Sequence, residues 1–321
     1  MSELPHDWVW AALRDAALPS PDSFIDGDWI EAPYITNHGI RLIQTGNIER
    51  ASFLDKAESH KYISLASFRL LNCKWVRAGD LLICRLADPI GRACEIPAEM
   101  DCAITSVDCT IVRIDSAKFD KRFVLHWLNS DTNLKAAADH AAGSTRSRIS
   151  RSNLAKLPIP KPLMVDQTKI AKILDTIDTS ICETEAIIAK LKSIKQGLLH
   201  DLLTRGIAAN GELRPPKSEA PQLYKDSPLG WIPKEWVVAK LESLLTEIGQ
   251  GWSPDCGSIS AQVGQWGVLK TTAIAWVGYS GQENKVLPLT LKARPALEVK
   301  VGDILVTRAG PASRVGVISY V

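Results

Sequence analysis

The chain has 321 residues, of which 45% are hydrophobic and 23% are charged, a composition typical of a globular protein with about two domains. Its 38 basic and 36 acidic side chains give a net charge of +2, which excludes a histone-like polycation but allows local basic patches. No apolar run approaches about 18 residues, and the polar start MSELPHDWVW does not resemble a signal peptide. We therefore expect a cytoplasmic protein without a transmembrane helix.

The cysteines point to a reducing compartment. There are seven, an odd number, and no CxxC pair occurs among them. The sequence therefore predicts neither a disulfide framework nor a zinc cluster, and no bound metal. We expect buried free thiols.

Residues 1–162 are expected to form a mostly β domain with a few helices. Short apolar runs bounded by turn residues predict strands at Ile40–Ile43, Leu81–Cys84 and Thr110–Ile114. Helices are expected at Phe119–Asn129, with Asp120 as a cap, and at Asn133–Ala142. The segment LPIPKP at 157–162 has proline at every second position, which favours an extended connector.

A long helix is predicted next, within a spacer segment at residues 163–206. It would begin at a capping Asp166 and end at Arg205-Gly206, about 60 Å later at 1.5 Å per residue. Its apolar side chains recur at alternating steps of four and three, which is the pattern of a coiled-coil seam. The seam positions are Ile170, Leu174, Ile177, Ile181, Ile188, Leu191, Leu198 and Leu202, with Thr184 and Lys195 as the polar members. A partner helix is expected to cover this stripe, and the alternative is a helix packed flat on a domain.

The chain repeats itself after the helix. Residues 207–226 are rich in Pro, Gly, Lys and Glu and predict a linker, and a second domain is expected at 227–321. LPHDWV at 4–9 recurs as IPKEWV at 232–237, and LIQTGNI at 42–48 recurs as VLKTTAI at 268–274. VRAGDLLICR at 76–85 recurs as VKVGDILVTR at 299–308. Three anchors in the same order, at offsets of 228, 226 and 223, indicate a domain-sized duplication.

The second copy is expected to be incomplete. The first copy continues for about 120 residues beyond Arg85, whereas 13 residues follow Arg308. A chain with two full copies would have roughly 430 residues. We therefore expect either a truncated product or a second chain that supplies the remainder.

No motif predicts catalysis. The sequence contains no G-x-G-x-x-G, no phosphate loop, no H-E-x-x-H and no G-x-S-x-G elbow, and its six histidines are scattered. Asp80 and Asp303 follow glycines at strand starts, where turn chemistry explains them better than acid–base chemistry does. We expect a non-catalytic chain with no cofactor.

A basic segment predicts contact with a nucleic-acid backbone. Between Ser116 and Lys161 nine Lys/Arg face three Asp, a local net charge of +6. At its centre, small hydroxyl residues alternate with Arg146, Arg148 and Arg151, and both kinds of side chain donate hydrogen bonds to phosphate oxygens. A solvated surface loop is the alternative.

Other polar side chains are candidates for reading base edges. In the first copy these are Gln44, Thr45, Asn47, Arg85 and Arg92, and their rough counterparts in the second are Lys270, Thr271 and Arg308. Arg85 has an alternative role, in which it braces the fold through a buried ion pair.

These features together resemble the specificity subunit of type I restriction–modification systems. The duplicated Pro-x-x-Trp and Gly-Asp motifs contribute, as does GST at 143–145 leading into LPIP at 157–160. The helix end KQGLLHDLLTRG at 195–206 and the opening DSPLGWIP at 226–233 are the most specific. Against the family pattern, the second helix and the rest of the second domain are missing, so we expect a C-terminally truncated member.

The resemblance implies an α+β fold with two target-recognition domains joined by a long coiled-coil-type helix. Each domain would read one half of a split double-stranded DNA sequence, with paired helices as the spacer. Partner modification subunits would methylate the DNA, and an ATP-dependent restriction subunit would cleave it, so that the assembled complex is a methyltransferase and site-specific deoxyribonuclease. A self-dimer through the helix is a further expectation. The competing hypothesis is a structural coiled-coil adaptor whose terminal domains bind protein rather than DNA.

Overall fold

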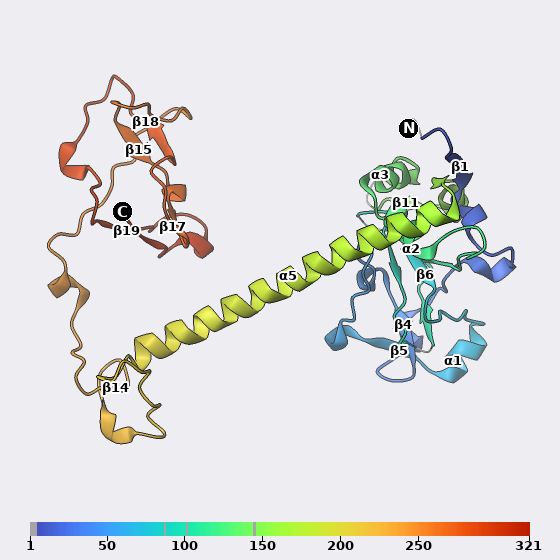
Figure 1. The fold of residues 1–321 in the computed structure, drawn as a ribbon, viewed down its shortest axis with the longest axis horizontal. Coiled ribbons are helices and arrows are strands. Elements are labelled where there is room, and N and C mark those ends of the chain that lie inside the picture. Colours follow the sequence, from blue (N-terminus) through green and yellow to red (C-terminus); the bar gives the residue numbers. More distant parts are fainter. Residues whose placement is uncertain (1–4, 87, 101, 144–145) are drawn as a thin grey trace. The chain divides into compact units, whose positions relative to one another are not determined.

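The computed structural model describes residues 5–86, 88–100, 102–143 and 146–321. The chain divides into two compact units, Met1–Leu198 and Leu199–Val321, each with its own β-sheets (Figure 1). Helices and antiparallel strands occupy separate stretches of the chain rather than alternating regularly, so the predicted α+β fold class is confirmed.

One antiparallel sheet of the first unit has the strand order β2-β9-β6-β7. Its strands are β2 (Phe24–Asp26), β9 (Cys109–Val112), β6 (Leu81–Cys84) and β7 (Ala93–Glu95). All four side chains of β6 are fully buried. Because alternate residues of a strand point to opposite faces, Leu81 and Ile83 join one core cluster while Leu82 and Cys84 join another. Both faces of this sheet are therefore covered, which explains the continuous apolar run.

A second four-stranded sheet has the order β3-β5-β4-β8. Its strands are β3 (Ile35–Thr36), β5 (Lys61–Ile63), β4 (Ile40–Ile43) and β8 (Ala103–Thr105), followed after β5 by helix α1 (Leu65–Leu70). The β4–β8 pair is parallel and the other pairs are antiparallel. The strands predicted at β4 and β6 have the predicted bounds, whereas β9 begins one residue earlier and ends two residues earlier than predicted.

Short helices and strands complete the first unit. They are α2 (Lys121–Leu128), α3 (Asp131–Asp139), β10 (Ala141–Ala142), β11 (Arg148–Ile149), α4 (Arg151–Ala155), β12 (Pro158–Lys161) and β1 (Val9–Ala12). As predicted, Asp120 caps α2, because its carboxylate accepts hydrogen bonds from the N–H groups of Arg122 and Phe123 at 2.9 and 3.1 Å. The segment predicted as an extended connector is β12, which pairs antiparallel with β1.

Helix α5 (Met164–Thr204) has 41 residues and begins two residues before the predicted cap, so that Asp166 lies in its first turn. The helix ends at Thr204, and Gly206 just beyond it has a φ of +66°, the left-handed conformation that commonly follows a helix end. Only Gln167 and Ala171 are buried, and residues 176–200 are all exposed. The alternative of a helix packed flat on a domain is therefore wrong for these residues. Across the described residues, no helix is both long and apolar enough to cross a membrane.

The segment expected to be a linker, residues 207–226, has local structure. Arg214 is 3% exposed, and its guanidinium donates to the backbone carbonyls of Arg205 and Ile207 and pairs with Glu235. Arg205 in turn donates from Nε to the carbonyl of Arg214 at 2.7 Å. A reciprocal pair of arginines thus folds the chain back on the end of α5, which differs from a flexible connector.

The second unit contains four two-stranded antiparallel sheets. They pair β13 (Tyr224–Lys225) with β14 (Ile232–Pro233), β15 (Gly267–Leu269) with β18 (Asn284–Val286), β16 (Ile274–Ala275) with β17 (Gly278–Tyr279), and β19 (Ile304–Val306) with β20 (Ile318–Tyr320). Many of its apolar side chains are exposed, for example Ile304 at 61% and Val306 at 56%.

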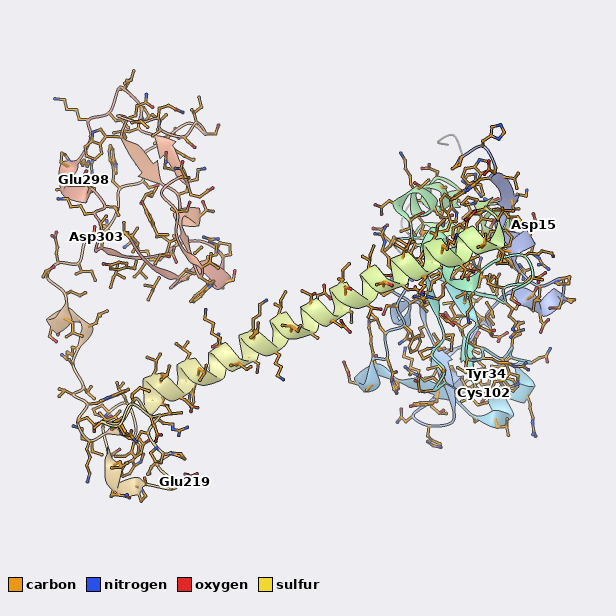
Figure 2. All side chains as sticks on the ribbon, in the orientation of Figure 1. Asp15, Tyr34, Cys102, Glu219, Glu298 and Asp303 are labelled. Carbon is orange, nitrogen blue, oxygen red and sulfur yellow. The ribbon has the colours of Figure 1, made fainter. Side chains whose placement is uncertain are left out.

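The repeated Gly-Asp motif forms the same turn in both units. Gly79 and Gly302 have φ of +81° and +99°, a conformation that glycine adopts without strain. The carboxylate that follows accepts a hydrogen bond from the backbone N–H three residues before it, at 3.0 Å for Asp80 and 2.8 Å for Asp303 (labelled in Figure 2). Each turn leads into a strand that pairs antiparallel with the next one, β6 with β7 and β19 with β20. The repeated Gly-Asp sequence therefore forms a repeated turn-and-strand structure.

Candidate nucleic-acid interface

A β-hairpin carries the centre of the predicted phosphate-binding segment. Strands β10 and β11 pair antiparallel, and Gly143 opens their connection with φ of +118°. A Cβ at Gly143 would lie 2.6 Å from the carbonyl oxygen of Arg146, so only glycine fits this close approach. Ser144 and Thr145, from the GST motif at 143–145, lie outside the described residues. Arg146 is exposed on this connection.

The three central arginines differ in how their charges are compensated. Arg148 lies on β11, where its Nε is 3.1 Å from a carboxylate oxygen of Asp108 and its Nη2 donates to the carbonyl of Val107 at 3.1 Å. Arg151 is the first residue of α4 and is exposed, as is Arg146. Within the described part of the chain, neither Arg146 nor Arg151 pairs with a carboxylate. These two side chains are therefore free to bind an anion, whereas Arg148 would have to give up its contact with Asp108 to do so.

Much of the predicted surplus of positive charge around the hairpin is compensated. Four of the nine basic side chains of residues 116–161 pair with carboxylates that lie outside that segment. The pairs are Lys118 with Asp115, Lys121 with Glu95, Arg122 with Asp175 and Arg148 with Asp108. The local net charge of +6 thus overstates the field, and the uncompensated part lies at the hairpin and α4.

The proposed base-reading residues in the turn after β4 differ in their burial. Thr45–Asn47 form a single 3-10 turn, in which Gln44 and Thr45 are half-buried and Asn47 is buried. The Asn47 side chain accepts a hydrogen bond from the N–H of Gln44 at 3.0 Å and donates to the carbonyl of Leu54 at 2.9 Å. Asn47 therefore shapes the turn, and Gln44 and Thr45 are the members with side-chain surface left for a ligand.

Arg85 lies in the interior of the first unit. It is 3% exposed, its Nη2 is 2.9 Å from a carboxylate oxygen of Asp26, and it donates to the carbonyls of Val107 at 2.6 Å and Ile149 at 3.2 Å. Burial lowers the pKa of Arg85, and the Asp26 carboxylate opposes that shift. This geometry matches the bracing alternative, because the guanidinium joins β6 to β2 and to the base of the hairpin.

Arg92 is also buried, with 7% exposure. Its Nε donates to the carbonyl of Ile48 at 2.7 Å, and its Nη atoms donate to the carbonyls of Pro89 at 3.0 Å and Thr45 at 3.1 Å. A guanidinium occupied in this way is not available to a base edge. Arg92 holds the turn that carries Gln44 and Thr45 instead of reading DNA itself.

In the second unit, the three candidates lie in the turn after β15 and at the end of β19. Lys270 is half-buried and has its Nζ 3.7 Å from a carboxylate oxygen of Glu283, while Thr271 is exposed. Arg308 is exposed too, unlike its sequence counterpart Arg85. The structure therefore does not bring these two arginines into equivalent surroundings.

Arg314 is the structural equivalent of Arg92 in the second unit, and the repeat did not predict it. Its Nη2 donates to the carbonyls of Thr271 and Ile274, both at 2.9 Å, and these are the repeat counterparts of the two carbonyls of the first-unit turn that Arg92 holds. Arg314 lies 222 residues after Arg92, whereas the turns are 226 apart, so the two arginines are out of register. The available signal was an arginine close to a glycine that lies two residues before a strand: Arg92 follows Gly91 ahead of β7, and Arg314 precedes Gly316 ahead of β20.

The predicted seam of α5 is open to solvent within the chain. Ile170 and Leu174 are half-buried near the first unit, and the six later seam residues are exposed. Their exposures are Ile177 50%, Ile181 51%, Ile188 46%, Leu191 58%, Leu198 52% and Leu202 43%. A stripe of this kind is a surface for another helix.

A family model agrees with this reading of the sequence. The model described as a type I restriction modification DNA specificity domain matches residues 81–193. The match begins at the first residue of β6, includes the β10–β11 hairpin and α4, and ends within α5.

Known proteins with similar sequences are specificity subunits. The chain is 41% identical over 128 residues to the type I restriction enzyme EcoEI specificity subunit of Escherichia coli, which is 40% of this chain and 20% of that protein. It is 25% identical over 271 residues to the putative type I restriction enzyme MjaX specificity subunit of Methanocaldococcus jannaschii, covering 82% of this chain and 58% of that one. The chain thus spans about a fifth and three fifths of these relatives.

A solved structure gives a weaker likeness. The HsdS subunit from Thermoanaerobacter tengcongensis superimposes with a TM-score of 0.42 and 18% identity, over 62% of this chain and 46% of that one. The sequence matches carry the comparison. Residues 81–193 match the specificity-domain model, and the chain is similar to specificity subunits of type I restriction enzymes.

Proposed function

We propose that this chain is the DNA-binding specificity subunit of a type I restriction–modification complex and that it directs partner methyltransferase and restriction subunits to a split DNA target. One observation carries the proposal. The specificity-domain match at residues 81–193 contains the β10–β11 hairpin and α4, where Arg146 and Arg151 are exposed and unpaired within the described residues. The chain itself would be non-catalytic and would need no cofactor.

The proposed contacts divide into two kinds. Arg146, Arg148 and Arg151 would hold phosphates, which supplies affinity without sequence information. Gln44 and Thr45 would read base edges in the first half-site, and the second unit would use Lys270, Thr271 and Arg308 for the other half. Asn47, Arg85 and Arg92 would act as scaffold, because their side chains are buried and bonded within the fold.

We also propose the functional division of the chain. Residues 1–162 would be the first recognition domain, 163–206 the spacer, 207–226 its link to the second recognition domain, and 227–321 would belong to that second domain. The exposed seam of α5 would bind another helix, either from a second copy of this chain or from another subunit, and the modification subunits would join around it.

A salt titration tests the phosphate contacts. Because each neutralised phosphate contributes about −0.9 to the slope of log affinity against log salt, Arg146→Ala and Arg151→Ala should each reduce the slope by about one when a duplex of random sequence is titrated. Arg148→Ala should have a smaller effect, since Asp108 already compensates its charge. Arg69→Ala is the matched control, because Arg69 is an exposed arginine on α1 away from the hairpin.

The directing role needs the assembled complex. The chain should co-purify with the modification subunits of its system, and methylation mapping should then show a split motif. A palindromic motif would mean that two copies of the first domain pair through α5. The adaptor hypothesis predicts neither methylation nor salt-dependent DNA binding, so the absence of both would replace the proposed function with it.

A further inference from the structure

Helix α5 is attached to the first unit over a short part of its length. Its two buried residues, Gln167 and Ala171, lie in its first two turns, and residues 176–200 are all exposed. Whatever fixes the direction of this helix must therefore act before Thr176 or very close to it.

The first attachment is made at Gln167, where the helix begins. The side chain is 1% exposed. Its Oε1 accepts a hydrogen bond from the N–H of Asp120 at 2.9 Å, and its Nε2 donates to the carbonyl of Pro162 at 3.0 Å. Thr168 adds a hydrogen bond from its hydroxyl to the Asp120 carboxylate at 3.1 Å. These bonds join the start of α5 to the cap of α2.

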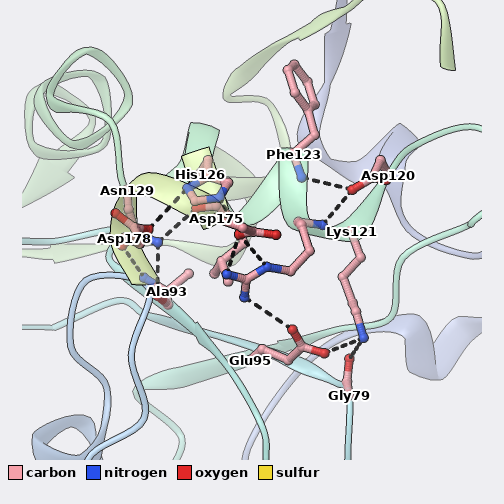
Figure 3. Close-up of polar contacts among 12 residues, drawn as sticks. Gly79, Ala93, Glu95, Asp120, Lys121, Phe123, His126, Asn129, Asp175 and Asp178 are labelled. Carbon is pink, nitrogen blue, oxygen red and sulfur yellow. Dashed lines mark hydrogen bonds and ion pairs between the residues drawn. The ribbon is translucent and has the colours of Figure 1, made fainter. Parts of the chain in front are cut away.

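The second attachment lies two turns later, at Asp175 (Figure 3). One oxygen of this carboxylate accepts from Nε and Nη2 of Arg122 at 2.9 and 2.6 Å, and lies 2.7 Å from Nε2 of His126. Arg122 also reaches Glu95 on β7 at 3.4 Å, so the contact continues into the sheet. A weaker contact of 3.8 Å joins His126 to Asp178.

We call Arg122, His126 and Asp175 the clamp, and the opposite charges of Arg122 and Asp175 favour their contact. The hydrogen bond from Arg122 holds the pKa of Asp175 below its usual value, and the same contact raises the pKa of Arg122. Both side chains are about one third exposed, so water screens the pair and its contribution to stability is expected to be small. The arrangement matters for its geometry, because two residues of α2 hold one carboxylate from adjacent turns.

We propose that Asp175, clamped by Arg122 and His126, is a positioning residue that fixes the direction in which α5 leaves the first unit. Gln167 alone is a pivot, whereas a second point of attachment eight residues further, about 12 Å along the axis, removes the freedom to swing. The helix from Gln167 to Thr204 is about 56 Å long, so a swing of about ten degrees would move its end by about 10 Å, or roughly three base-pair steps. Resting on the proposed function, the clamp would keep the distance between the two DNA half-sites constant.

Two native cysteines allow a direct measurement of the helix direction. Cys102, on the surface of the first unit (Figure 2), and Cys182, on α5 seven residues beyond the clamp, are both exposed. With Cys256→Ser as background, spin labels on these two thiols report the distance between domain and helix by double electron–electron resonance. Dilution with unlabelled protein removes distances between copies.

Removing the clamp should broaden this distance distribution at least twofold. Asp175→Asn and Arg122→Gln, which break it from opposite sides, should both do so, while Asp175→Glu should restore a narrow distribution. Glu183→Gln is the control, because it removes a carboxylate from an exposed position on the same helix, and it should leave the width unchanged. Thermal unfolding of each variant confirms that it is folded. A width that stays unchanged in folded Asp175→Asn and Arg122→Gln overturns the proposal.

The DNA consequence is measured separately. Both the clamp and the proposed function stand if Asp175→Asn broadens the distance distribution and the complex assembled with this variant methylates motifs with more than one gap length. If the distribution broadens and the wild-type complex methylates nothing, the clamp stands and the proposed function fails. If methylation is normal and the width is unchanged, the clamp fails alone.

Discussion

Replacement of Arg85 by methionine is the sharpest test of how the first unit is built. The substitution keeps an unbranched side chain of similar length but removes the partners of the Asp26 carboxylate and of the Val107 and Ile149 carbonyls. Losing one member of a buried ion pair costs about 3–5 kcal/mol, and the 22% exposure of the Asp26 side chain lets water recover part of it. We therefore expect the free energy of unfolding of the first unit to fall by about 3 kcal/mol.

Amide hydrogen exchange in β2, β6 and β11 measures this loss where it occurs, because the Arg85 contacts join these three strands. Arg308→Met is the control from the second copy, since Arg308 is exposed and its replacement should change stability by less than about 0.5 kcal/mol. A loss below about 1 kcal/mol in Arg85→Met would refute the bracing role. If Arg85→Met stayed folded but lost its DNA sequence preference, we would again count Arg85 among the base-reading residues.

Three further predictions concern Arg92, Asp175 and the cysteines of the first unit. Arg92→Ala should cost about 3 kcal/mol and raise exchange in the turn after β4, whereas Arg92→Lys should recover only part of this, because lysine cannot reach three carbonyls with fixed geometry. Because the pKa of Asp175 is lowered in the folded state, the carboxylate should stabilise the fold fully above about pH 4, and this stabilisation should be lost as the pH falls further. The difference between the free energies of urea unfolding of the wild type and of Asp175→Asn, measured as a function of pH, tests this. Burial raises the pKa of Cys73 to about 11 and that of Cys109 to about 12, so an aromatic disulfide reagent at pH 8 should label these thiols only after unfolding, while the exposed Cys182 reacts at once.

The sequence predicted the elements whose cause is local. The bounds of β4 and β6, the Asp120 cap and the Gly-Asp turns all depend on residues within one short segment. The length of α5 was predictable for the same reason, since its periodic apolar pattern and its glycine stop are contiguous. Such signals need no knowledge of what the segment packs against.

Electrostatic partners were not predictable, because they are distant in sequence. Counting charges between residues 116 and 161 gave a surplus that Glu95 and Asp175 reduce from outside the segment. The orientation of Asn47 was hidden for a related reason, since a 3-10 turn directs its amide to Leu54 instead of outward. Residue type gives the chemistry of a side chain, and only the fold gives its direction.

The second copy shows which part of the repeat is independent of its surroundings. β6 is buried on both faces, while β19 exposes Ile304 and Val306, so the two strands lie in different environments. Even so, Arg92 holds the carbonyls of the turn after β4 and Arg314 holds those of the turn after β15, from positions that are out of register in the repeat. Because the arginine reaches these carbonyls from two different backbone positions, we attribute the contact to the shape of the turn and not to the position of the arginine in the repeat. That turn carries Gln44 and Thr45 in the first copy, so its rigidity is a property that base recognition at this place would require.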